Sequence, residues 1–326
     1  MNQNYSGGLN DRCTAILFRQ GSEWSELGIE TIDAYGGARV FDFGTSQFGS
    51  IAGGCLLARL CMADLGTVSV GMSSSDPLGV PEVQVQTDHP FLACMAAQYA
   101  GWPVASGKYF AMGSGPARIL RQKEELFQRF PVSDSTDSEA WLVLESARVP
   151  NEDTIRMIAN ECGVSSAKLR ICVSRTASLP GTVQIVARSI ETTMHKLFEL
   201  TFDLRTIVSA MGTAPLPPIG NDDLQAIGWT NDAILYGSRV WLCVDCEQQA
   251  VDGILDQIPS CSSADYGKPF REIFERYNRD FYAIDRMLFS PAQVTIHNLR
   301  TGRTVRAGER RNDVLTDSFG LASVSN

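Results

Sequence analysis

The sequence is poor in histidine, in long apolar runs and in positive charge, and each shortage excludes a class of protein. Its three histidines, His89, His195 and His297, are scattered and lack the carboxylate spacing typical of metal sites. No run of about 18 apolar residues is present, so we expect no transmembrane helix. The first residues, MNQNYSGGLNDRC, have neither the basic start nor the apolar run of a secretory signal. With a net charge of -9, the chain is a poor partner for nucleic acid or an anionic membrane.

The nine cysteines, an odd number, do not indicate a disulfide framework. Cys55, Cys61 and Cys172 lie in apolar segments, which is typical of buried, reduced thiols. Cys243 and Cys246 have C-x-x-C spacing, but a structural zinc site needs a second cysteine pair that the chain lacks. We therefore predict a cytoplasmic protein that uses no metal.

Length and element order predict an α/β (mixed α+β) protein of two domains. The 326 residues exceed one ordinary domain, and helices alternate with both hairpins and helical crossovers. We place the boundary near Pro150. This gives an N-terminal α/β domain, residues 1–150, and a C-terminal α/β domain, residues 151–326, whose last strands can return to the first domain.

Several segments carry clear element signals. Ser50 predicts the start of a helix, and the apolar residues 142–144 predict a strand buried on both faces. Residues 181–198 predict one long helix, and residues 233–245 predict a strand. Three prolines between residues 212 and 220 predict a rigid connector that is neither helix nor central strand.

A glycine-rich turn, Gly113-Ser114-Gly115, lies between a predicted strand and a predicted helix. Backbone N–H groups at such a helix start suit an anion or a polar ring edge. The turn lacks the third glycine of a dinucleotide fingerprint and the Lys-Ser/Thr ending of a phosphate loop. Ligand contact and a plain tight turn therefore remain equally open.

Arg188 and Glu191 stand three residues apart in a predicted helix, so both lie on one face. The arginine can hold the carboxylate ionised, and the apolar residues beside the pair favour partial burial. A surface ion pair of little consequence is the commoner outcome of this spacing. The residues alone leave catalysis as the minority interpretation.

Two polar segments at predicted element ends are further candidates. Asn231 and Asp232 precede a predicted strand, and Ser263 and Asp265 precede a predicted helix. Binding residues often lie on such short loops, and ordinary helix caps have the same composition. Both interpretations stay open. No nucleophile-elbow sequence supports a Ser-His-Asp hydrolase.

Taken in order, these segments resemble the methenyltetrahydromethanopterin cyclohydrolases, the bacterial members more than the archaeal ones. The resemblance runs from Asp33 to Pro291 and rests on GGARVFDFG, DLGTVSV, QYAGW, AMGSGPAR, WLVLES, VQIVARSIETTMHK, GTAPLPP, TNDAILYGSRVWLCVD, SADYGKPFREIF and DFYAIDRMLFSPA. The chain departs from the bacterial members at Ala117 and Ser238, where glycine is frequent. Neither change removes a reactive group.

The resemblance implies two tightly associated domains with mixed sheets, a ligand cleft between them, and a homotrimer. It implies reversible hydration of 5,10-methenyl-tetrahydromethanopterin to 5-formyl-tetrahydromethanopterin in one-carbon metabolism, in the setting of formaldehyde oxidation. The pterin derivative is then the substrate carrier, and no cofactor is required. Arg188 and Glu191 match the catalytic R-x-x-E of the family. We expect the pterin to contact Gly113, Ser114, Gly115, Asn231, Asp232, Ser263 and Asp265.

Three other functions are to be weighed against this one. The first is a non-catalytic pterin-binding homologue, acting as a carrier or sensor, against which the presence of both Arg188 and Glu191 speaks. The second is a nucleotide-dependent oxidoreductase, for which the glycine fingerprint is incomplete. The third is a structural subunit, for which no ligand would stabilise the fold.

Overall fold

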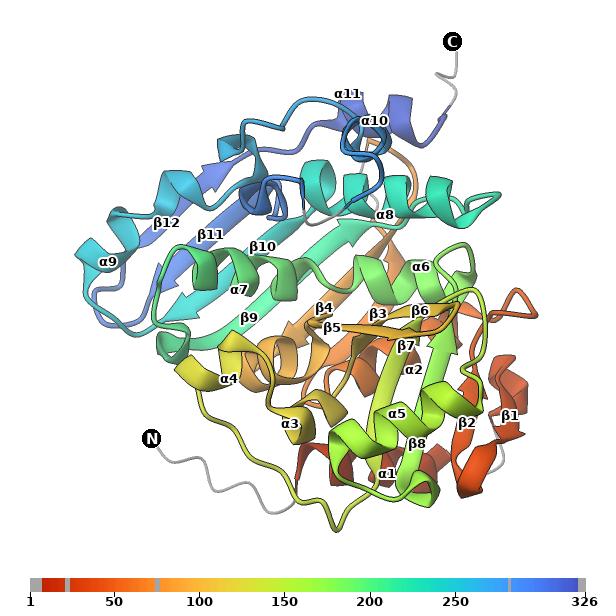
Figure 1. The fold of residues 1–326 in the computed structure, drawn as a ribbon. Coiled ribbons are helices and arrows are strands. Elements are labelled where there is room, and N and C mark those ends of the chain that lie inside the picture. The colour runs from red at the N-terminus through yellow and green to blue at the C-terminus, as the bar shows by residue number, and fades with distance from the viewer. Residues whose placement is uncertain (1–7, 21–23, 74–76, 281–282, 322–326) are drawn as a thin grey trace. The chain divides into compact units, whose positions relative to one another are not determined.

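The computed structural model describes residues 8–20, 24–73, 77–280 and 283–321. These residues form helices and two mixed six-stranded sheets, which confirms the predicted α/β class (Figure 1). Backbone contacts divide the chain into two compact units. The N-terminal unit takes the described residues up to Gly66 and then Leu92–Gly181, and the C-terminal unit takes Thr67–Phe91 and the described residues from Thr182 onward.

The sheet of the N-terminal unit has the order β1-β2-β8-β7-β6-β5. Its strands are β1 (Glu30–Asp33), β2 (Arg39–Asp42), β5 (Trp102–Ser106), β6 (Tyr109–Ser114), β7 (Ala140–Glu145) and β8 (Leu169–Ser174). Strands β2, β8 and β7 run parallel, and the remaining pairs are antiparallel. All residues of β7 except Glu145 are buried, as its apolar sequence predicts.

Two of the five α-helices described in the N-terminal unit, α2 (Ile51–Cys61) and α5 (Glu152–Cys162), begin at a side-chain cap. The other three are α1 (Leu9–Gln20), α3 (Ala117–Arg121) and α4 (Glu125–Arg129). The backbone N–H of Gly53 donates to Ser50 Oγ at 2.9 Å, which confirms the predicted start of α2. Asn151 accepts from the N–H of Thr154 in the same way at the start of α5. Such caps satisfy N–H groups that have no partner within the helix.

The sheet of the C-terminal unit has the order β12-β11-β10-β9-β4-β3. Its strands are β3 (Thr67–Met72), β4 (Pro81–Thr87), β9 (Ile207–Pro215), β10 (Arg239–Val244), β11 (Gln293–Asn298) and β12 (Thr304–Gly308). Only β10 and β11 are parallel neighbours among these described strands. The helices are α7 (Ser189–Glu199), α8 (Asp223–Gly237), α9 (Gln248–Asp252), α10 (Phe270–Arg276) and α11 (Asn312–Ser318), and α7 and α8 both pack against β9 (Figure 1).

The division of the chain differs from the boundary predicted near Pro150. Strand β8 lies beyond Pro150 but pairs with β7 and β2, so the N-terminal sheet continues across that position. Strands β3 and β4 lie before it but belong to the other sheet, where β4 pairs with β9. The last strands, β11 and β12, pair with β10 and stay in the C-terminal unit.

The long helix predicted over residues 181–198 is interrupted. Helix α6 (Leu179–Val186) ends before Ala187, and α7 begins after Arg188. At the junction the N–H of Arg188 bonds to the carbonyl of Ile185, three residues back, instead of four. This tighter turn places Arg188 at the corner between two helices.

The strand predicted over residues 233–245 is wrong in its first half. Residues 233–237 form the end of α8, and only β10 is extended. Asp222 caps α8 by accepting from the N–H of Gln225, and a short apolar run does not distinguish a buried helix from a strand. The connector predicted from residue 212 is also wrong at its start, because β9 continues to Pro215 as a central strand. Pro215 is the last residue of β9 and lies two residues past Thr213, where the register with β10 ends.

Candidate active site

Helix α7 positions both members of the predicted Arg188–Glu191 pair. Arg188 directly precedes the helix, and Glu191 lies in its first turn. Nη1 of Arg188 lies 3.8 Å from Oε2 of Glu191, and the two residues are only 8% and 6% exposed. The N–H groups of a first helical turn favour a carboxylate at this position. The structure therefore shows a buried ion pair and not the surface pair that is commoner at this spacing.

A second contact holds the Arg188 guanidinium. Its Nη2 donates to Oε1 of Gln184 at 3.0 Å, and Gln184 is buried on α6. A planar guanidinium can serve two acceptors in fixed directions, which an ammonium group cannot do as well. Gln184 was not among the predicted site residues. Its position four residues before Arg188 is the sequence signal that would have identified it.

Strand β9 allows the start of α7 to approach closely. A Cβ atom at Gly212 would lie 2.4 Å from Oγ of Ser189, the first residue of α7. This Oγ is buried and has no hydrogen-bond partner within the described residues. Glycine at position 212 therefore sets the distance between the sheet and the helix turn that carries Glu191.

The Gly113-Ser114-Gly115 turn is packed tightly inside the N-terminal unit. The N–H of Gly115 donates to the carbonyl of Ala97 at 2.7 Å. Gly115 has a φ of +98°, and a Cβ atom there would lie 3.1 Å from the Trp141 carbonyl oxygen. Ser114 is buried, with its Oγ 3.6 Å from the Cys61 sulfur. These contacts give Gly115 a packing role, while pterin contact at this turn stays a prediction.

Asn231 and Asp232 lie inside α8 and not on the loop that the sequence predicts. The side chain of Asn231 donates to the carbonyl of Ile227 at 2.8 Å. Asp232 is buried and accepts from the N–H of Phe270 at 2.7 Å and from Ser318 Oγ at 2.5 Å. It thereby joins α8 to the start of α10 and to α11. Burial raises the pKa of the Asp232 carboxyl to about 7, against the lowering by these two hydrogen bonds.

The raised pKa of Asp232 makes the stability of the C-terminal unit pH-dependent. The folded protein favours the neutral form of the Asp232 carboxyl. The contribution of Asp232 to the free energy of unfolding is therefore complete below about pH 4, the pKa in the unfolded chain, and is lost as pH rises through about 7. Asp232→Asn keeps the shape without the charge. We expect the melting temperature of this variant, relative to wild type, to increase between pH 5 and pH 8.

The control for that comparison is Asp245→Asn, since the Asp245 side chain is 57% exposed and lies on the surface beside Arg300. Its melting temperature should follow that of wild type across the same range. Parallel curves for wild type and Asp232→Asn would show that Asp232 is not buried as an acid.

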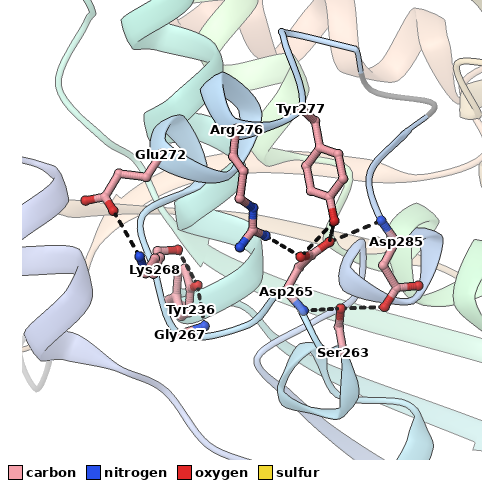
Figure 2. A network of polar contacts seen from close by, with 9 residues as sticks. All are labelled: Tyr236, Ser263, Asp265, Gly267, Lys268, Glu272, Arg276, Tyr277 and Asp285. Carbon is pink, nitrogen blue, oxygen red and sulfur yellow. Dashed lines mark hydrogen bonds and ion pairs between the residues drawn. The ribbon is translucent and has the colours of Figure 1, made fainter.

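Ser263 and Asp265 belong to a polar network in the C-terminal unit (Figure 2). The Asp265 carboxylate accepts from Arg276, from the hydroxyl of Tyr277 at 3.0 Å and from the backbone N–H of Asp285 at 3.3 Å. Ser263 Oγ donates to Asp285 Oδ2 at 2.6 Å. The network holds the loop before α10 against the end of that helix. Contact of either residue with the pterin remains a prediction.

The structure thus brings Arg188 and Glu191 together, and places the other predicted residues in separate internal networks. Gly113, Ser114 and Gly115 lie in the N-terminal unit, and the remaining candidates lie in the C-terminal unit. Within the described ranges, no group of three or more His, Cys, Asp or Glu side chains could hold a metal ion. The arrangement offers one buried carboxylate beside one fixed cation, which suits proton transfer next to a charged substrate.

Comparison with known proteins agrees with the resemblance. The family model described as "Cyclohydrolase (MCH)" matches residues 8–319. A protein of Rhodopirellula baltica named methenyltetrahydromethanopterin cyclohydrolase is 50% identical over 289 residues, covering 87% of each chain. Proteins of the same name from Methanococcoides burtonii and Methylobacillus flagellatus are 39% and 41% identical, covering 97% and 88% of this chain and 99% and 88% of their own. The chain belongs to the cyclohydrolase (MCH) family.

Proposed function

We propose that this chain hydrates 5,10-methenyl-tetrahydromethanopterin to 5-formyl-tetrahydromethanopterin, reversibly, as an enzyme of one-carbon metabolism. The observation that carries the proposal is the buried Arg188–Glu191 pair, with 3.8 Å between the charged groups. Relatives named for this reaction match nearly the whole chain.

The chemistry asks for little more than proton transfer. The substrate is a cyclic amidinium in which one carbon bridges two ring nitrogens and carries delocalised positive charge. Glu191 takes a proton from the attacking water and then gives a proton to the ring nitrogen that leaves. The carboxylate also attracts the cationic substrate, so its benefit must be greater in the transition state than in the bound ground state.

Arg188 keeps Glu191 ionised and fixes its direction, at the cost of some repulsion toward the cationic ring. Nη2 of the guanidinium donates to Gln184, while Nη1 faces the Glu191 carboxylate at 3.8 Å. The bridge carbon is electrophilic without a Lewis acid, so we expect the reaction to need no metal or redox cofactor. The tetrahydromethanopterin derivative is then substrate only.

The assay follows the loss of methenyl absorbance when purified protein meets methenyl-tetrahydromethanopterin. The proposal predicts rapid conversion to the 5-formyl product. A non-catalytic pterin-binding homologue would bind the compound and leave the absorbance to decay at the uncatalysed rate. That second function is disfavoured by the burial of a carboxylate and an arginine together, which a carrier does not require.

We place the reaction in formaldehyde oxidation, as in methylotrophic metabolism, and in the cytoplasm. Support for the compartment comes from the cysteines, most of which are buried thiols. Burial raises the pKa of Cys13 and Cys172 and keeps both protonated and inert. No helix in the described parts of the chain combines the length and apolar character that a membrane span needs.

We also propose a homotrimer, with the open face of the C-terminal sheet as one contact. Trp241 on β10 and Met211 on β9 are register partners, and both side chains are exposed, 41% and 52% respectively. Adjacent exposed apolar side chains on a sheet face are typical of an interface. Light scattering should give three times 35.6 kDa for wild type and a smaller mass for a folded Trp241→Glu variant. A monomeric wild type would contradict the proposal.

A further inference from the structure

The proposed reaction releases one proton in each turnover. The substrate carries one positive charge, water adds both of its hydrogens to the system, and the formyl product is neutral. One hydrogen of the water ends on the ring nitrogen, so the other must leave as a proton. Glu191 receives that proton while its side chain is only 8% exposed. The inference below rests on this proposed function and concerns where the proton goes next.

Helix α7 carries a row of titratable side chains that starts at Glu191, and we call this row the file. His195 follows four residues later and Glu199 four residues after that, so all three lie on one face. His195 Nε2 lies 3.6 Å from Oε1 of Glu199. The same Glu199 oxygen lies 3.7 Å from Nη1 of Arg286.

Solvent exposure increases along this file. The exposed fraction of the side chain rises from 8% at Glu191 to 16% at His195 and 24% at Glu199. Arg286 is 67% exposed at the far end. The file therefore leads from a buried carboxylate to a charged group in contact with water.

The electrostatic surroundings suit His195 to a transient proton. Burial lowers its pKa from the usual value of 6.5, Glu199 opposes this, and the cations Arg286 and Lys196 add to it. His195 is therefore neutral at pH 7 and can accept a proton. Lys196, next to it, is held elsewhere, because its Nζ donates to Ser262 Oγ at 3.2 Å and to the Met287 carbonyl.

We propose that His195 receives the released proton from Glu191 and passes it to Glu199, from which it enters solvent. The water O–H bond breaks as the oxygen bonds to the bridge carbon, and Glu191 holds that first proton. Glu191 gives it to the ring nitrogen as the carbon–nitrogen bond breaks, and takes the hydroxyl proton of the tetrahedral intermediate. That second proton moves along the file, which returns Glu191 to its ionised state. The reverse reaction uses the same steps backwards.

The test compares His195→Ala with wild type and with Asn160→Ala, which truncates an exposed side chain on α5 and leaves α7 unchanged. We expect kcat of His195→Ala to fall at least about tenfold, with KM within about twofold. Added imidazole should restore turnover in proportion to its concentration, because it replaces the missing proton carrier. A residue that only supports the fold would show no such rescue. Asn160→Ala should behave as wild type.

Glu199→Gln, which keeps the shape of the side chain, is the second variant and guards against misfolding of His195→Ala. It should lower kcat and make turnover depend on buffer concentration. Near-normal kcat in both variants, with no response to imidazole or buffer, would overturn the relay. An inactive wild-type protein would instead refute the proposed function, so the two failures are distinct.

Discussion

Glu191→Gln should turn over at least about a hundredfold more slowly than wild type, the usual scale of general acid–base help. Glutamine keeps the size of the side chain but can neither take a proton from water nor return one to the ring nitrogen. The change removes the carboxylate partner of the buried Arg188, so the melting temperature of the variant is measured first to show that it is folded. Pterin affinity, measured by titration, should be retained to within about tenfold.

The matched control is Glu152→Gln, which makes the same change in the first turn of α5, where the side chain is 55% exposed. Its turnover should equal that of wild type. A Glu191→Gln protein with near-normal turnover would remove Glu191 from the mechanism. Loss of binding together with turnover would assign the carboxylate to attraction of the cationic ring and not to proton transfer.

Arg188→Lys should lower kcat by roughly 10- to 100-fold, although the positive charge is kept. The guanidinium faces Glu191 with Nη1 and donates to Gln184 with Nη2. A lysine ammonium is a single point of charge that cannot hold both directions, so Glu191 loses its fixed orientation. The lost charge-assisted contact is worth about 1.5–3 kcal/mol, which gives that range of rates.

Arg205→Lys is the control, because Arg205 pairs with Asp203 at the surface with 71% of its side chain exposed. Such pairs contribute little, so this variant should be indistinguishable from wild type. If Arg188→Lys also keeps full activity, a positive charge at position 188 is enough for catalysis. The contact with Gln184 then plays no part in positioning Glu191.

Features of the site that depend on residues close together in the sequence could be predicted, and those that depend on distant segments could not. Arg188 and Glu191 are three residues apart, so helical periodicity alone places them on one face. Their burial depends on β9, whose Gly212 admits the start of α7, and nothing in the helix sequence reveals that contact. The turn at Arg188 depends equally on the surrounding fold, since the apolar pattern runs through it without a break.

Longer-range features were predicted less well. Asp232 is part of α8 because Asp222 caps that helix ten residues earlier, whereas the apolar run after Asp232 fits strand and helix alike. The partners of Asp265, Arg276 and Asp285, lie 11 and 20 residues away, and only the folded chain brings them together. Strands β3 and β4 belong to the C-terminal sheet because β4 pairs with β9, and no local sequence signal encodes that pairing.

The most direct test of the central claim is a single-turnover experiment with enzyme in excess over methenyl-tetrahydromethanopterin, run for wild type and Glu191→Gln together. This separates binding of the pterin from hydration of its methenyl bridge. The account predicts that both proteins bind, that wild type then loses the methenyl absorbance rapidly, and that Glu191→Gln retains it at least about a hundredfold longer. Equal decay in the two proteins would contradict the assignment of proton transfer to Glu191.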